Sequence, residues 1–154
     1  MPRLVEVDDS AWPLVIVRIP PVLDTAAIES MFRGMDGVVD RKSRFAAMID
    51  TRELSQFPNA VERKTIATWM TERTTAEALY NLGNAVVMTS PSARAVFTAI
   101  QWIRRPVTAH FITGTTLAGI DWCCMRLKQA GLSLPQTIGT VRAREESRAV
   151  PSTA

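Results

Sequence analysis

The chain is 154 residues long, 47% hydrophobic, and carries a formal net charge of +3, which fits one domain with a core of its own. No apolar run approaches the ~20 residues that span a bilayer, and the charged, proline-containing start does not have the form of a signal peptide, so we expect a cytoplasmic protein without a membrane span. The basic residues are scattered in small groups and form no stripe, and we therefore expect no nucleic-acid partner.

The first part of the chain predicts a strand hairpin, a helix and a third strand. Apolar runs at 4–8 and 14–19 are separated by a short polar and proline turn, which favours an antiparallel pair. Asp24 can cap a helix whose apolar residues keep helical spacing, at Ile28, Met31, Phe32, Met35 and Val38. The run at 44–50 is apolar enough for a strand covered on both faces.

Helices and strands then alternate. Asn59 can cap a helix from 60 to about 74, and residues 76–82 either extend it or form a separate turn. The remaining expected elements alternate strand, helix, strand, helix, at 84–90, 91–104, 107–114 and 116–129.

This order predicts an α/β fold, β-β-α-β-α-β-α-β-α, with a mostly parallel five-stranded sheet, an N-terminal antiparallel hairpin and four main helices. From residue 133 onward the sequence becomes polar and loses its periodicity. We expect a single domain at 1–132 and a flexible C-terminal tail at 133–154.

Two segments, AAMIDTRELSQFP and AVVMTSPSARAVFTAIQWI, carry a family resemblance. Together with the element order, they resemble the STAS fold of bacterial anti-sigma-factor antagonists, and more closely the SpoIIAA-like proteins, which are related in shape to CRAL-TRIO lipid-binding domains. The resemblance implies a regulatory protein-interaction module. STAS proteins switched by phosphorylation carry the modified serine at the helix start after the third strand. The matching residues here, 58–61, have no hydroxyl group, so the usual serine switch is not expected.

Polar residues at the carboxyl ends of the parallel strands are the first candidate site. Open α/β sheets bind ligands at these ends, where Asp50, Thr51, Ser90 and Thr113 would converge. Ser92 and Arg94 follow Ser90, and the helix N-terminus with Arg94 could hold an anion. The favoured alternatives are that Ser90 caps the helix, that Arg94 is solvated and that Asp50 caps its turn.

A second candidate comes from surplus apolar surface on the last two predicted helices. A helix covering one sheet face needs a single apolar stripe, yet both helices carry more. One interpretation is ordinary packing between neighbouring helices on one sheet face. The other is a shared patch containing Trp102, Trp122 and Met125, used for a homodimer, another protein or a lipid-like ligand.

The residues that usually carry catalysis do not form a set. His110 is the only histidine and lies in a predicted strand, which favours a structural role. Cys123 and Cys124 are adjacent in an apolar helix, without zinc-site spacing, which indicates buried free thiols. We therefore expect a protein without a metal or cofactor that is not an enzyme. The leading hypothesis is a protein-interaction or regulatory module, and the alternative is a carrier or sensor of a small apolar ligand.

Overall fold

A computed structural model describes residues 3–149 of the chain. Its five strands form one sheet in the order β1-β2-β3-β4-β5, with β1 and β2 antiparallel and the other neighbours parallel. The bounds of the strands are Glu6–Ala11, Leu14–Arg18, Phe45–Asp50, Asn81–Val87 and His110–Thr113. The predicted α/β fold with an N-terminal hairpin is confirmed.

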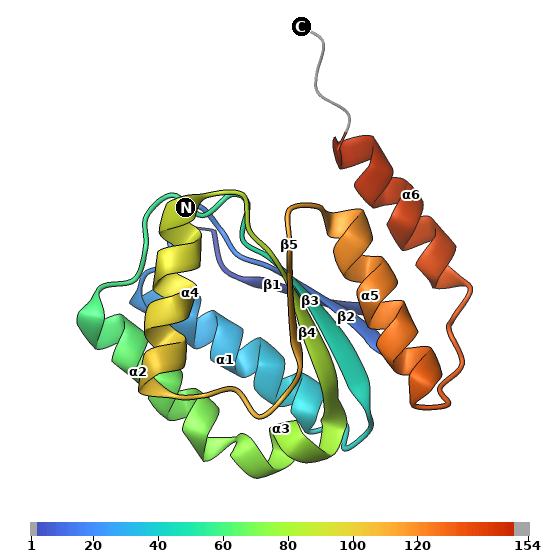
Figure 1. The fold of residues 1–154 in the computed structure, drawn as a ribbon, viewed down its shortest axis with the longest axis horizontal. Helices are drawn as coiled ribbons and strands as arrows, with labels where there is room; N and C mark the ends of the chain where they lie inside the picture. The colour runs from blue at the N-terminus through green and yellow to red at the C-terminus, as the bar shows by residue number, and fades with distance from the viewer. Residues whose placement is uncertain (1–2, 150–154) are drawn as a thin grey trace, which may run out of the picture.

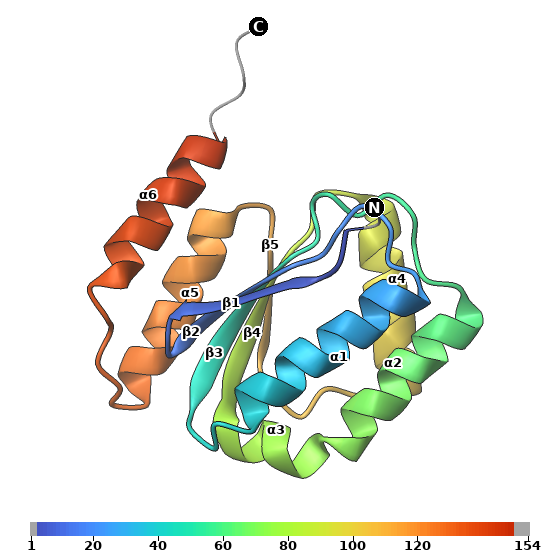
Figure 2. The same ribbon diagram turned by 180° about the vertical axis from the view of Figure 1, so that it is seen from behind.

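Within the described residues, six helices pack around the sheet. They are α1 (Thr25–Val39), α2 (Ala60–Glu72), α3 (Thr74–Tyr80), α4 (Pro91–Ile103), α5 (Thr116–Gln129) and α6 (Thr137–Ala149). The parallel strands are added in one direction, so right-handed crossovers place α1, α2 and α4 on the same face. Figures 1 and 2 show these three helices on one side and α5 with α6 on the other. Residues 76–82, left open by the sequence, fall mainly in the separate short helix α3.

Each face of the sheet has its own hydrophobic core, because alternate strand residues point to opposite sides. Leu14, Ile16 and Met48 pack with residues of α5, whereas Val15 and Val17 pack with residues of α1. Apolar side chains on both faces explain why the central strands read as nearly continuous apolar runs. The predicted helix caps are also confirmed at Asp24, Asn59 and Ser90.

The two cysteines are residues of α5 and belong to the hydrophobic core between this helix and the sheet. Both are free thiols and both are buried, as the sequence predicted. Burial raises the pKa of the Cys123 thiol to about 12 and also raises the pKa of Cys124. The thiols are therefore protonated near neutral pH and serve as small core side chains.

The predicted flexible tail is corrected by the structure. Residues 137–149 form α6, which lies beside α5 (Figure 1) and buries Ile138 and Val141. The third position of this inner stripe is Glu145, which is fully buried. A charged residue at a core position interrupts the apolar periodicity, and this is why the sequence pattern misses the helix. Residues 150–154 of the predicted tail lie outside the described residues.

Within residues 3–149, none of the helices combines the length and the apolar character needed to cross a membrane.

Candidate ligand-binding site

A cavity of about 220 Å³ lies between the sheet and the helices α1, α2 and α4. Val96, Phe97 and Ile100 of α4 face this cavity and are only half buried. The sheet contributes, among others, Ile49 and Val86, and Met88 follows directly after β4. The apolar side chains between α4 and the sheet therefore line an open space. On the other face, the apolar side chains between α5 and the sheet pack against one another in the core.

The walls of the cavity are almost entirely apolar. The helices α1 and α2 add Met31, Met35, Ile66 and Met70, and the loop before α2 adds Leu54 and Pro58. Methionine side chains are flexible and adapt to differently shaped ligands. The volume exceeds that of an engineered apolar cavity of ~150 Å³ that binds benzene. It accommodates a body of roughly seven water-sized groups at ~30 Å³ each.

One end of the cavity carries a chain of polar side chains. Asn81 Nδ2 donates to Asn84 Oδ1 at 3.0 Å, and Asn84 Nδ2 lies 3.5 Å from His110 Nε2. His110 Nδ1 lies 2.9 Å from the carbonyl oxygen of Thr108. These contacts fit the neutral tautomer with its proton on Nδ1, which donates to Thr108, while Nε2 accepts from Asn84. Burial lowers the pKa of His110 from 6.5, so the ring is neutral at pH 7.

Two arginines and a glutamate lie at the same end. Arg104 Nη2 donates to Glu77 Oε2 and to Thr74 Oγ1, both at 3.0 Å. The side chains of Arg104 and Glu77 are only 8% and 14% exposed, so this ion pair is largely removed from water. Arg73, which also lines the cavity, donates to Asp36, and this hydrogen bond raises the pKa of Arg73.

Trp69 forms part of the wall between this polar end and the apolar interior. Its ring stacks on Phe32 with centroids 4.7 Å apart and planes 8° apart. The Arg73 guanidinium also lies over the indole ring, 4.7 Å from its centroid. Contacts with these two neighbours hold Trp69 in place, and its ring gives the cavity an aromatic wall.

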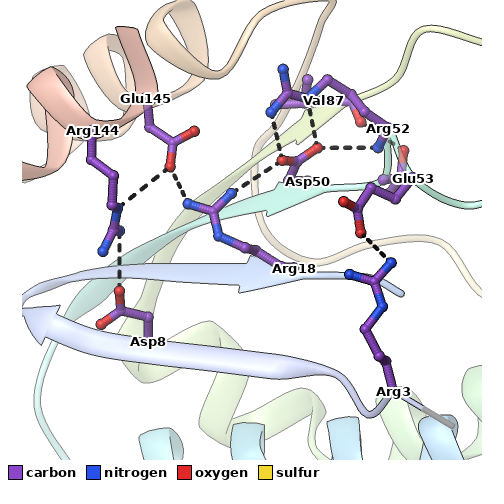
Figure 3. A network of polar contacts seen from close by, with 10 residues as sticks. Arg3, Asp8, Arg18, Asp50, Arg52, Glu53, Val87, Arg144 and Glu145 are labelled. Carbon is purple, nitrogen blue, oxygen red and sulfur yellow. Dashed lines mark hydrogen bonds and ion pairs between the residues drawn. The ribbon is translucent and has the colours of Figure 1, made fainter. Parts of the chain in front are cut away.

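The predicted strand-end residues Asp50 and Thr51 are engaged with neighbouring groups. Asp50 Oδ2 accepts from Arg18 at 3.3 Å and from Arg52 at 2.9 Å (Figure 3). Thr51 Oγ1 donates to the carbonyl oxygen of Val87 at 2.6 Å. Asp50 therefore holds a network of ion pairs at the carboxyl end of β3, where it lines a second, polar hollow with Arg18 and Arg52, whereas Thr51 belongs to the lining of the apolar cavity.

Ser90 is the N-cap of α4, as the favoured interpretation of the sequence has it. Its Oγ accepts from the backbone N–H of Ala93 at 3.0 Å. Ser92 and Arg94 are exposed on the first turn of the helix. The hydrogen bond of Ser90 explains the Thr-Ser-Pro-Ser sequence as a helix start, and no bound anion is needed to account for it.

The predicted shared patch of Trp102, Trp122 and Met125 is wrong. Trp102 is on α4 and is 85% exposed, whereas Trp122 and Met125 are on α5, across the sheet. The Trp122 ring stacks on Phe111, with centroids 5.6 Å apart. The chain changes to the other face of the sheet after β5, and helix periodicity does not show which face a helix covers.

The sequence did not identify Arg104, Trp69 or Asn84 as site residues. Arg104 reads there as one member of a small basic group, and Trp69 as an ordinary apolar helix position. Polar residues inside buried strands, such as Asn84 and His110, were the available signal. Among residues 3–149, no group of three or more histidine, cysteine, aspartate or glutamate residues could hold a metal ion.

Comparison of this chain with protein-family models, with curated proteins and with solved structures finds no match.

Proposed function

We propose that the protein acts by binding a small ligand with an apolar body in the cavity beneath α4, as a carrier or a sensor. The single observation that supports this most strongly is the cavity itself, about 220 Å³ with almost entirely apolar walls. Ligand pockets are typically concave and mostly apolar, with a few polar groups that orient the ligand. The polar end formed by Asn84, His110 and Arg104 fits this description.

The partly exposed wall of the cavity supports the same proposal. Val96, Phe97 and Ile100 line the cavity and are only half buried, so apolar surface there stays in contact with water. A ligand that covers this surface gains ~25 cal/mol for each Å² of apolar area removed from water. Because such a ligand binds the folded protein, it would also raise the stability of the fold.

The polar groups support binding in preference to catalysis. His110 is held between Asn84 and the Thr108 carbonyl group, and Arg104 is paired with Glu77. These contacts fix the side chains in position and leave no nucleophile paired with a base in the cavity wall of the described residues. The order of the elements along the chain and the two segments quoted above carry the STAS-like resemblance, which we retain as a proposal.

Titration with octan-1-ol in a calorimeter tests the proposed function. We expect one saturable site, a dissociation constant on the order of 1 mM or tighter, and a negative heat-capacity change from burial of apolar surface. The melting temperature should rise with alcohol concentration. Linear, unsaturable heats together with an unchanged melting temperature would refute a binding cavity.

Self-association through α4 is a second candidate function. Trp102 is 85% exposed, and the neighbouring Ile103 and Val107 are 53% and 48% exposed. Apolar surface of this kind around an exposed tryptophan is typical of interaction sites. The contact would join two copies of this chain.

The substitution Trp102→Glu tests this surface. We expect the wild-type protein to be a dimer in size-exclusion chromatography with light scattering, and the variant to be a monomer because a buried carboxylate is costly. Met125→Glu, on the opposite side of the sheet and 43% exposed in the wild type, is the matched control and should leave the dimer intact. A monomeric wild-type protein would rule out self-association.

A further inference from the structure

We propose that the ligand of this cavity carries a carboxylate group, and that Arg104 binds it through Nη1. This inference rests on the proposed function, because it assigns the chemistry of a ligand held in the same cavity. It starts from two nitrogen atoms that are buried and have no hydrogen-bond partner among residues 3–149. They are Arg104 Nη1 and Trp69 Nε1, and both residues line the cavity.

The Arg104 guanidinium is only partly satisfied by the protein. Its Nη2 makes both side-chain contacts, to Glu77 and to Thr74. Its Nη1 is buried in a side chain that is 8% exposed. A buried donor without a partner costs about 1–3 kcal/mol, and more when the group is charged. An acceptor supplied by the ligand would remove this cost.

The polar atoms of the lining that are buried and lack a partner are donors. Asn84 Oδ1 accepts from Asn81, and Glu77 Oε2 accepts from Arg104. The unpartnered buried atoms among the lining residues are both nitrogen atoms that can only donate, on Arg104 and Trp69. A ligand group that satisfies these two atoms must therefore present acceptors.

A carboxylate meets this requirement better than a neutral carbonyl group. It has two oxygen atoms and about four acceptor positions, and its hydrogen bonds to a guanidinium group are charge-assisted and roughly twice as strong as neutral ones. Arg73 lines the same cavity, so two guanidinium groups and the carboxylate of Glu77 surround the ligand. Arg73 is itself paired with Asp36, so the charge of the ligand is met mainly by the donor of Arg104 that has no partner.

The fold also gives the ligand a direction. Arg104 follows the C-terminal end of α4, near α3 and the start of β5, whereas Ala93 and Met88 line the cavity near the N-terminal end of α4. A carboxylate at Arg104 would therefore direct the apolar body along α4 toward the carboxyl ends of the strands. With room for roughly seven water-sized groups, a medium-length chain such as that of octanoate fits.

Octanoate and octanamide form the decisive pair of probes, since they differ mainly in charge. At pH 8 octanoate is ionised and His110 is neutral. We expect octanoate to bind at least tenfold more tightly than octanamide to the wild-type protein. In the double variant Glu77→Gln/Arg104→Gln, which removes both charges of the buried pair together, this ratio should fall to about one. Arg105→Gln, at the exposed neighbouring position, is the control and should keep the wild-type ratio.

A second measurement uses only the wild-type protein and therefore does not depend on whether the double variant folds. Carbon-13 NMR of carboxyl-labelled octanoate bound to the wild-type protein should show a carboxyl pKa below that of the free acid, because the guanidinium group favours the charged form. Equal binding of the two probes, or a bound carboxyl pKa at or above the free value, would overturn the assignment of a carboxylate. Binding of octan-1-ol alone keeps the proposed function, whereas failure of octan-1-ol, octanamide and octanoate together removes that function as well.

Discussion

Replacement of Val96 by tryptophan is expected to weaken the binding of octan-1-ol by at least tenfold. Val96 is half buried on α4 and lines the cavity. An indole ring at this position would occupy much of the 220 Å³ that the ligand needs. The side chain enters existing space instead of a closely packed core, so we expect the melting temperature to stay the same or rise. Calorimetric titration and thermal unfolding measure the two effects.

The substitution Ala95→Trp provides the matched control. Ala95 is the preceding residue of α4, is exposed and does not line the cavity. The same increase in side-chain size there should leave the affinity for octan-1-ol within twofold of the wild-type value. If Val96→Trp binds the alcohol as tightly as Ala95→Trp, the ligand does not occupy the space beneath α4.

The second large effect concerns α6 and its buried charge. The substitution Glu145→Ala should lower the free energy of unfolding by about 3 kcal/mol. Glu145 is fully buried and pairs with Arg18, whose side chain is only 14% exposed (Figure 3). Removing one partner of a buried pair leaves the other charge poorly compensated, which typically costs about 3–5 kcal/mol. Arg18 keeps its contact with Asp50 at 3.3 Å, and we therefore expect a value at the lower end.

Denaturant unfolding of Glu145→Ala and Glu146→Ala measures this contribution. Glu146 is the next residue of α6 and is exposed, so its replacement should change the free energy of unfolding by less than about 0.5 kcal/mol. Both substitutions give the helix the same new residue, and their difference isolates the buried pair. Equal stabilities would show that α6 does not contribute to the core through Glu145.

Much of the fold could be predicted because local signals and the global structure agree. Asp24, Asn59 and Ser90 each begin a helix through a side chain that accepts from the backbone, and the residue types alone indicate this. The parallel strands are apolar on both faces, which shows in the sequence as continuous runs. The helix α6 was missed because Glu145 replaces an apolar residue in its inner stripe. Glu145 pairs with Arg18, which lies 127 residues earlier in the chain. A pattern of neighbouring residues cannot reveal a contact at this sequence separation.

The site was harder to predict than the fold, since it depends on distances between elements. The sequence showed that α4 has more apolar surface than one sheet face needs. Part of that surplus, including Val96, Phe97 and Ile100, faces the cavity, while Trp102 is exposed. The periodicity of a helix shows how many of its faces are apolar. It does not show whether an apolar face packs against other side chains or lines a cavity. The donor atoms of Arg104 and Trp69 indicate a site only because the structure shows that they are buried and have no hydrogen-bond partner among residues 3–149. The sequence does not show this.

Amide chemical shifts of nitrogen-15-labelled protein during titration with octan-1-ol test the central claim most directly. We expect saturable shifts, with one common dissociation constant, at residues that line the cavity, including Trp69, Val96 and His110. Residues of α5 around Cys123, on the other side of the sheet, should not respond. The absence of saturable shifts, or their concentration on α5 and α6, would contradict a ligand site beneath α4.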